Sequence, residues 1–383
     1  MDYPHLGVSP PTQNWATRWH HPLLFVISTW AISRLLIILM MQVVAPALPF
    51  SPVNVWSAAG PLTNFTPALG WDLFAHWDGV WYEKVATQGY DYVNDDQQNS
   101  IAFFPLFPLL TYLLMKGGLP FAVAGALINN LAFLGALVVL YRWVEETHGA
   151  NSARWVTAIL AWCPFSLFGT VAYTEGLFLL CTTAALRAFD QQQYRWAAFW
   201  GTLATATRAP GIVLVPAFLI TAWREKRPTV AYFTAIAVSG GILLFSLYCA
   251  IQFHDPLAFW REQHSWGHAG WGALLLKIIT KGSLAIDSLV KLFVLLGSGW
   301  LFWLLRHQLP RVAIIYGYSS LALLLVSGAT ASFNRFAFAI VSISMAVGLL
   351  LAQHPRWGYC VIGGFALGLA GFSIRFAWWG WVA

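Results

Sequence analysis

The stretch PLLFVISTWAISRLLIILMMQVV, residues 22–44, decides the fold class of this 383-residue chain, because Arg34 is its single charged side chain. A helix needs about 20 apolar residues to cross the hydrocarbon core of a bilayer. The stretch is too long for the apolar part of a signal peptide, and no obvious small-residue cleavage site follows it. It therefore predicts a first membrane-spanning helix.

Further apolar runs follow along the chain and predict an all-α, polytopic membrane protein. Several runs are short and meet at proline or polar residues, which is typical of broken or tilted helices around a cavity. No soluble domain, heptad repeat or low-complexity segment interrupts them, so we expect one integral-membrane domain over residues 1–383. The eleven predicted spans are 22–44, 121–143, 153–171, 173–189, 194–207, 210–223, 230–252, 285–305, 311–330, 336–352 and 357–379.

The composition excludes several classes of protein. Hydrophobic residues make up 58% of the chain and charged residues only 9%, whereas about 25% of a soluble domain is charged. A soluble enzyme, a disordered protein and a nucleic-acid binder are therefore excluded. The net charge of +6 fits an excess of Lys and Arg in cytoplasmic loops. The four cysteines lie within apolar runs and resemble small buried hydrophobes, not disulfide partners or metal ligands.

The placement of Lys and Arg predicts the orientation. With Arg18 in the cytoplasm, residues 50–100 lie outside, and this region holds six of the fifteen acidic residues. The run 101–115 contains two prolines and is too short to span comfortably, so we expect an outer re-entrant or juxtamembrane segment. Outer loop 50–120 then carries the candidate catalytic motif, and a second outer loop covers 253–284. The later basic residues fall inside: Arg142, Arg154, Arg187, Arg195, Arg224, Lys226, Arg227, Arg306, Arg311 and Arg356.

The densest group of polar and aromatic residues is WDLFAHWDGVWYE, residues 71–83. Its central carboxylate, Asp78, is close to Trp77 and Trp81, and partial desolvation beside tryptophan is typical of a general base. Aromatic faces also suit sugar rings and acyl chains. The same pattern fits an interfacial amphipathic helix with an aromatic belt, and the residues alone leave both interpretations open.

This group and a series of later motifs resemble the PIG-V family, which comprises GPI mannosyltransferase II and its prokaryotic relatives among the polytopic GT-C glycosyltransferases. The motifs stand in the family's order between residues 71 and 336. Each is weakly specific alone, and their order is more specific. They are HWDGVWY (76–82), GY (89–90), AFFPLFP (102–108), NN (129–130), PFS (164–166), YTEGLF (173–178), ATRAPG (206–211), HDPLAF (254–259) with Gln263 and Trp266, and SFNRF (332–336).

The resemblance implies an inverting transfer of a hexose, with mannose favoured, from a polyprenyl-phosphate donor similar to dolichol-phosphate mannose. The acceptor would be a lipid-linked molecule or a glycan, and the reaction would occur at the extracytoplasmic or lumenal face. Asp78 takes the place of the general base. The leaving group is a phosphate, so a cation at that position assists its departure. No cofactor is implied and metal independence is expected, although a divalent cation remains compatible with the pattern.

Two arginines are candidates for binding the donor phosphate. Arg208 lies at a helix break on the outer face, where an unpaired Arg near lipid is costly, and snorkelling towards the headgroups is the alternative. Arg335 opens another span on the same face. Its motif reads SFNRF, whereas many relatives have Ser-Met-Pro-Arg-Tyr, so its geometry stays open. Glu175 is the second catalytic candidate: it would bind hydroxyls, buttress Asp78, or serve only as a helix N-terminal charge.

Seven further residues are predicted to bind substrate from their places in these motifs: His76, Trp77, Trp81, Tyr82, Tyr90, His254 and Gln263. His254, Asp255, His264 and His268 match no standard zinc spacing, so no metal site is predicted.

The expected partners are the donor lipid, the acceptor and the bilayer, without nucleic acid. We expect a monomer, with a partner subunit possible in the pathway. A prokaryotic plasma membrane is favoured, or the endoplasmic reticulum membrane if the host is eukaryotic. Two alternatives remain: a lipid or glycolipid transporter, and a non-catalytic subunit of glycan assembly. A transporter would favour internal repeats with ionisable residues in both halves, whereas the sequence shows no repeat and groups its ionisable residues on one side.

Overall fold

The computed structural model describes residues 15–50, 52–57, 60–93, 98–265, 270–281 and 286–382. Asp95, Asp96, Trp266 and His268 lie outside these ranges, and the side chains of Arg18 and His264 are likewise not described.

The described chain is dominated by helices, as predicted. Within the described residues, five helical segments are long and apolar enough to cross a membrane: Pro22–Ala47, Phe121–Trp162, Thr229–Phe253, Ile286–Leu304 and Pro355–Ala377. Shorter apolar helices cover Leu106–Lys116, Ala209–Arg224, Arg311–Ser327 and Val341–Gln353. The protein is therefore an all-helical, multi-pass membrane protein in its main architecture, and the predicted fold class is confirmed at that level.

The helices divide the chain differently from the eleven predicted spans. Spans 121–143 and 153–171 join in α5 (Phe121–Trp162), which is kinked at Gly149 and followed by the 3-10 helix η4 (Pro164–Gly169). Span 230–252 consists of α9 (Thr229–Ala237) and α10 (Gly240–Phe253). The helices that cover the other predicted spans after residue 171 are α6 (Glu175–Asp190), α7 (Tyr194–Thr207), α8 (Leu214–Arg224), α13 (Ile286–Leu304), α14 (Arg311–Ser327), α15 (Phe333–Phe338), α16 (Val341–Gln353) and α17 (Pro355–Ala377).

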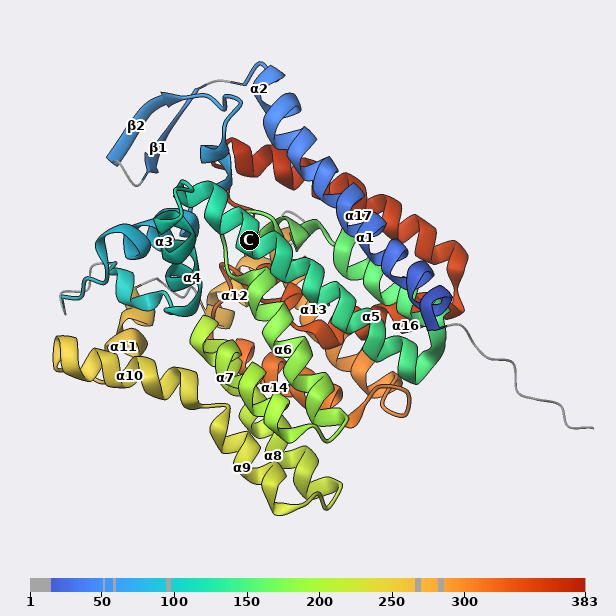
Figure 1. Ribbon diagram of the computed structural model, residues 1–383. Coiled ribbons are helices and arrows are strands. Elements are labelled where there is room, and N and C mark those ends of the chain that lie inside the picture. Colours follow the sequence, from blue (N-terminus) through green and yellow to red (C-terminus); the bar gives the residue numbers. More distant parts are fainter. Residues whose placement is uncertain are drawn as a thin grey trace, which may run out of the picture.

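Helix α5 lies at the centre of the packing and contacts α1 (Trp15–Leu39), α4 (Leu106–Lys116), α6 and α16 (Figure 1). The small residue Gly176 permits one of these contacts. A Cβ on Gly176 would lie 2.3 Å from the backbone oxygen of Asn129, so no larger residue fits between α6 and α5. The Asn129 side chain in turn accepts the Gly176 N–H at 2.7 Å. This close approach positions Glu175 at the start of α6.

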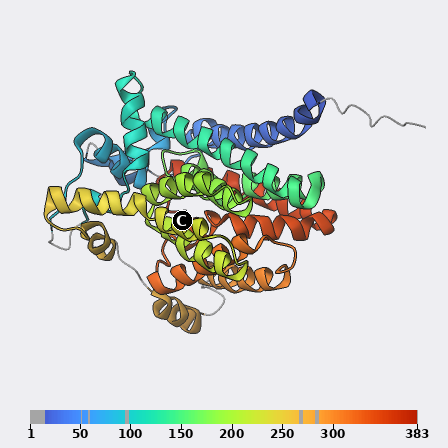
Figure 2. The ribbon, with the colours of Figure 1, turned by 60° about the horizontal axis from the view of Figure 1, so that its bottom comes forward.

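The segments predicted to be outer loops form small elements of their own at one end of the bundle. Helices α3 (Asp78–Gln88) and α4 (Leu106–Lys116) lie near α10 and α11 (Ala258–Ser265), as Figures 1 and 2 show. Helix α12 (Gly270–Lys281) follows. With 11 residues, α4 is about 16 Å long, roughly half of the hydrocarbon core. Helix α4 is therefore one of the shorter apolar helices, as are Arg311–Ser327 and Val341–Gln353.

The purely α-helical prediction needs one correction. Strands β1 (Val53–Ser57) and β2 (Gly60–Phe65) form an antiparallel hairpin after α2 (Ala45–Ala47), at the top left of Figure 1. A register shift interrupts their pairing between Val53 and Val55. The alternation that would mark a strand is short here and contains Pro61, which explains why the sequence did not reveal it.

Arg34, buried within α1, joins that helix to the segment before α6. Its guanidinium donates to the backbone oxygens of Ser166 (2.7 Å) and Ala161 (3.0 Å), and to the hydroxyls of Thr170 (2.8 Å) and Ser166 (2.7 Å). The side chain therefore pairs across helices. The arginine satisfies the backbone carbonyls that η4 leaves without helical partners.

We expect Arg34→Met to lower the free energy of unfolding by about 2–4 kcal/mol, because buried acceptors lose charged donors. Arg195→Met serves as the control, since Arg195 is exposed and surface changes usually stay within about 0.5 kcal/mol. Denaturant unfolding of both variants in detergent micelles measures the difference. Equal stability of the two variants would contradict this structural role.

Candidate active site

Asp78 stands at the first position of α3, directly after a strained residue. Trp77 has φ 56° and ψ −117°, which is a rare conformation for a bulky side chain. The N–H of Asp78 donates to the hydroxyl of Tyr173 at 3.2 Å. Strained backbone persists where the surrounding structure fixes it, and such positions gather at functional sites. Tyr173 is one of the fixing contacts.

The main feature of the site is an alternating chain of four charges, Asp78–Arg335–Glu175–Arg208. Nη1 of Arg335 lies 2.7 Å from Oδ2 of Asp78, and Nε of Arg335 lies 3.3 Å from Oε1 of Glu175. The same Glu175 oxygen accepts a hydrogen bond from Nη1 of Arg208. The side chains are 18%, 7%, 1% and 11% exposed in that order. Buried charges need such partners.

Aromatic rings surround both arginines. The Arg335 guanidinium lies 5.3–5.5 Å from the ring centres of Phe168, Tyr173 and Phe336. Arg208 lies 5.1 Å from the ring centre of Phe336, which both arginines therefore share. Such contacts favour a cation and exclude water, so they strengthen the ion pairs.

A cavity of about 1500 Å³ lies beside this chain of charges. Asp78, Arg208 and Arg335 line it, and most of its remaining wall is apolar or aromatic. Four of the predicted substrate-binding residues also line it: Trp77, Trp81, Tyr82 and Gln263. The structure thus brings seven of the eleven predicted site residues to one cavity. The other four, His76, Tyr90, Glu175 and His254, are not part of its wall.

Glu175 lies behind the cavity and contacts both arginines. It is 1% exposed, and the structure shows no direct hydrogen bond between its side chain and Asp78. Its influence on Asp78 therefore passes through Arg335. Of the roles considered for Glu175, this geometry favours the buttress and gives no direct route to a sugar hydroxyl.

His76 packs against the end of the chain. Its Nδ1 lies 3.0 Å from the backbone oxygen of Phe376, and its ring stacks on Trp379 with centroids 4.1 Å apart. The carbonyl only accepts, so Nδ1 carries the proton. Burial lowers the pKa of His76 to about 4. This side chain is therefore neutral and holds α17 to the loop before α3, and it is not part of the cavity wall.

Tyr90 and His254 also occupy positions that are set by contacts within the protein. The Tyr90 hydroxyl donates to the backbone oxygen of Phe103 at 2.7 Å, and burial raises the pKa of Tyr90. His254 ends α10 in the left-handed conformation, and the neighbouring Asp255 pairs with Arg261 at 2.6 Å. Among the described residues no group of three or more His, Cys, Asp or Glu side chains could hold a metal ion.

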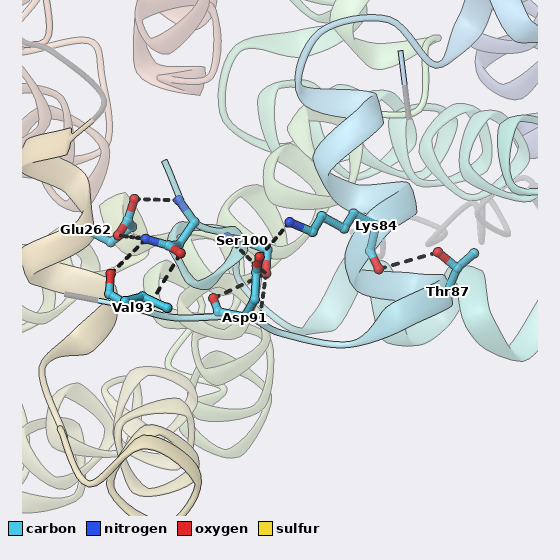
Figure 3. A network of polar contacts seen from close by, with 7 residues as sticks. Lys84, Thr87, Asp91, Val93, Ser100 and Glu262 are labelled. Atoms are coloured by element: carbon cyan, nitrogen blue, oxygen red, sulfur yellow. Dashed lines mark hydrogen bonds and ion pairs between the residues drawn. The ribbon is translucent and has the colours of Figure 1, made fainter. Parts of the chain in front are cut away.

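A polar network joins α3 to α11 (Figure 3), and its residue Lys84 lines the cavity. Lys84 pairs with Asp91 at 2.5 Å, and the Ser100 N–H donates to Asp91 at 3.0 Å. Asn99 donates from its backbone and its amide to the two carboxylate oxygens of Glu262, at 2.8 and 3.1 Å. Partial burial opposes ionisation, but the bonds from Lys84 and Ser100 lower the pKa of Asp91.

The network places Gln263, the residue after Glu262, at the cavity wall, where its amide donates to the backbone oxygen of Ala102 at 3.3 Å. Sequence reasoning grouped Gln263 with the site through its motif. It missed Tyr173 as a partner of Asp78 and missed Trp378, Trp379 and Trp381, which line the cavity from the end of the chain. The one available signal was the concentration of tryptophan at positions 378–381.

Comparison with known proteins identifies the family of the chain. The family model described as Mannosyltransferase (PIG-V) matches residues 21–224, more than half of the 383 residues. The chain belongs to the PIG-V mannosyltransferase family. The matched region of this PIG-V chain includes Asp78, Glu175 and Arg208, whereas Arg335 and the terminal tryptophans lie beyond it.

Curated relatives include GPI alpha-1,6-mannosyltransferase 2 from Homo sapiens, 28% identical over 152 residues, covering 37% of this chain and 30% of that protein. GPI mannosyltransferase 2 from Cryptococcus neoformans is 26% identical over 204 residues, covering 50% of this chain and 44% of that protein. These matches therefore span less than half of the relatives' lengths.

The fold is similar to that of ArnT from Cupriavidus metallidurans, solved bound to undecaprenyl phosphate. The TM-score is 0.52 at 16% identity, covering 91% of this chain and 63% of that protein. This likeness confirms the predicted GT-C type of fold for the PIG-V chain.

We expect Glu175→Gln to lower the free energy of unfolding by about 3–5 kcal/mol, because it leaves two buried arginines without their shared carboxylate. The matched control is Glu146→Gln. Glu146 pairs with Arg187 but is 43% exposed, and exposed pairs contribute about 0–1 kcal/mol. Denaturant titration in micelles compares the two, and similar losses would contradict the buried pairing.

Acidification should destabilise the protein through His76. The pKa of His76 is 6.5, its usual value, in the unfolded protein and about 4 in the folded protein. The unfolded protein therefore binds the extra proton first, and stability falls as the pH drops from 6.5 towards 4. Thermal unfolding at pH 7 and pH 5 should show a smaller decrease for His76→Gln than for the wild type. An unchanged difference would argue against a buried, neutral His76.

Proposed function

We propose that this protein is an inverting membrane glycosyltransferase. It moves a hexose, with mannose favoured, from a polyprenyl-phosphate sugar to a hydroxyl of a lipid-linked or glycan acceptor. The observation that carries the proposal is the Asp78–Arg335–Glu175–Arg208 chain at the wall of a cavity of about 1500 Å³. It gives one cavity a carboxylate that can accept a proton and two cations that can hold a phosphate.

Asp78 acts as the general base. Its Oδ2 is held by Arg335, and the structure shows no hydrogen bond to Oδ1 from the described residues. In the reaction, Oδ1 removes the proton of the acceptor hydroxyl as that oxygen attacks the anomeric carbon. The bond from this carbon to the phosphate oxygen breaks on the opposite face. The products are the inverted glycoside, polyprenyl phosphate and a protonated Asp78.

Arg208 is suited to the leaving phosphate. Only its Nη1 is bonded to Glu175, and the structure shows no hydrogen bond from the rest of its guanidinium to the described residues. A guanidinium can bind a phosphate oxygen with two N–H groups. Arg335 is more fully engaged, because it contacts both carboxylates. We therefore assign it mainly to orienting Asp78, with the phosphate as a further partner during the reaction.

Glu175 positions the two arginines without touching the substrate. Both cations stay charged beside a buried carboxylate, and the site is thus organised before the substrate arrives. The arginines supply the positive charge that neutralises the leaving phosphate, so the proposed reaction includes no metal step.

The orientation also belongs to this proposal. We place the cavity at the extracytoplasmic or lumenal face, with eleven spans and the short α4 region at the outer side. The distribution of charge supports this orientation: acidic residues lie between 72 and 96, and basic residues lie in the loops of the opposite face. A prokaryotic plasma membrane is favoured over the endoplasmic reticulum. The protein works as a monomer in this scheme.

The test uses purified protein and a panel of polyprenyl-phosphate sugars, including polyprenyl-phosphate mannose, with transfer to a glycolipid acceptor as the readout. Asp78→Asn should lower kcat by about 10²–10⁴, the usual contribution of a general base. Asp72→Asn, a carboxylate in the same loop that is exposed and absent from the cavity wall, should retain wild-type turnover. Full activity of Asp78→Asn in a folded sample, or lipid translocation without transfer, would overturn the proposal.

A further inference from the structure

The chain ends in a tryptophan-rich segment, Trp378–Trp379–Gly380–Trp381, that lines the cavity together with Trp77. We propose that Trp77, Trp379 and Trp381 form a subsite for a pyranose ring. We call this group the aromatic wall. The inference rests on the proposed function, because it assigns a substrate subsite to the same cavity. The segment lies more than 150 residues beyond the end of the family match at residue 224.

Trp77 contacts both of the other rings of the aromatic wall. The ring centroids of Trp77 and Trp381 are 5.0 Å apart in an edge-to-face arrangement, and those of Trp77 and Trp379 are 5.8 Å apart. The stack on His76 supports Trp379 from another side. Flat rings held by neighbours present a preformed apolar surface, which is what the C–H face of a pyranose requires.

The polar atoms of these rings also point to a ligand. Trp378 donates from Nε1 to the backbone oxygen of Ala45 at 3.0 Å, and Trp381 donates to that of Ala331 at 3.3 Å. The indole N–H groups of Trp77 and Trp379 are buried and have no hydrogen-bond partner among the described residues. Buried donors normally have partners. Neither N–H is open to solvent as the rings are packed, so a sugar hydroxyl would accept from these groups once the rings shift, whereas an acyl chain has no atom that does so.

The backbone of this segment is strained where it lies against the cavity. Trp379 has φ 56°, the same left-handed value as Trp77. The N–H of Gly380 donates to the backbone oxygen of Arg375 at 2.7 Å, and a Cβ on Gly380 would lie 2.4 Å from Cγ of Arg375. The chain thus folds back only because residue 380 has no side chain. Two strained tryptophans at one cavity are typical of a binding site.

The aromatic wall lies next to the reacting groups. Trp77 directly precedes Asp78 in the chain. The indole N–H of Trp381 donates to the backbone oxygen of Ala331, which lies four residues before Arg335. Residues 378–381 carry no ionisable side chain, so they do not compete with the arginines for the phosphate. A pyranose on the aromatic wall would therefore lie near Asp78, on a neutral part of the cavity. This ring is either the hexose of the donor or a sugar of the acceptor.

The experiment compares Trp381→Ala with Trp381→Phe, using Trp357→Ala as the control. Trp357 is 71% exposed and lies on α17 away from the cavity wall. KM is measured separately for polyprenyl-phosphate mannose and for octyl α-D-mannopyranoside as acceptor. We expect Trp381→Ala to raise one of the two KM values about tenfold or more and Trp381→Phe to restore most of the loss. The KM that rises identifies which sugar the subsite holds.

A binding measurement makes the inference testable without turnover. The tryptophan fluorescence of protein in nanodiscs is titrated with methyl α-D-mannopyranoside and with D-mannitol, which has hydroxyls but no ring. We expect a saturable change only with the pyranoside, weakened about tenfold in Trp381→Ala and unchanged in the control. Equal responses to both compounds would overturn the subsite, as would unchanged binding and KM values in folded Trp381→Ala.

These outcomes separate the two proposals. If Asp78→Asn is inactive while Trp381→Ala behaves as the wild type, the proposed function stands and the aromatic wall is wrong. If the wild type transfers no sugar but binds the pyranoside through Trp381, the subsite stands and the transferase proposal fails.

Discussion

The buried carboxylate of Glu175 is the constraint on which the site depends. It is 1% exposed and pairs with two arginines from distant parts of the chain. Removing a charge from water costs several kcal/mol unless partners compensate it. The start of α6, the end of α7 and helix α15 must therefore meet at one point. Because Arg335 also holds Asp78, this meeting fixes the geometry of α3 and of the cavity.

Arg34 is a second buried charge, and its hydrogen-bond partners are neutral. It satisfies carbonyl and hydroxyl oxygens of the segment 161–170, directly before the loop that leads to Glu175. Tyr173, within that loop, accepts the N–H of Asp78. Polar contacts of the segment 161–173 thus reach α1 at one end and Asp78 at the other. In a chain with 9% charged residues, the few buried charges organise the architecture because each one must find partners.

Several features could be predicted from the sequence because they depend on local pattern. Low charge and long apolar runs indicated the membrane, and the motif around Asp78 indicated a family that the comparison confirms. Other features depend on contacts between distant residues. The role of His76 depends on Phe376, 300 residues away, and no spacing within its own motif predicts that contact. The β1–β2 hairpin was missed because its pattern is short and irregular.

The sequence by itself determined the membrane class, the family and the identity of the charged residues at the site. These follow from transfer energies and residue order, which need no knowledge of which helices touch. Only the tertiary structure decided that Glu175 lies behind the arginines, that Arg335 holds Asp78, and that the terminal tryptophans line the same cavity. The physical reason is that pairing and desolvation depend on three-dimensional proximity, and residues 78 and 335 lie 257 positions apart in the chain.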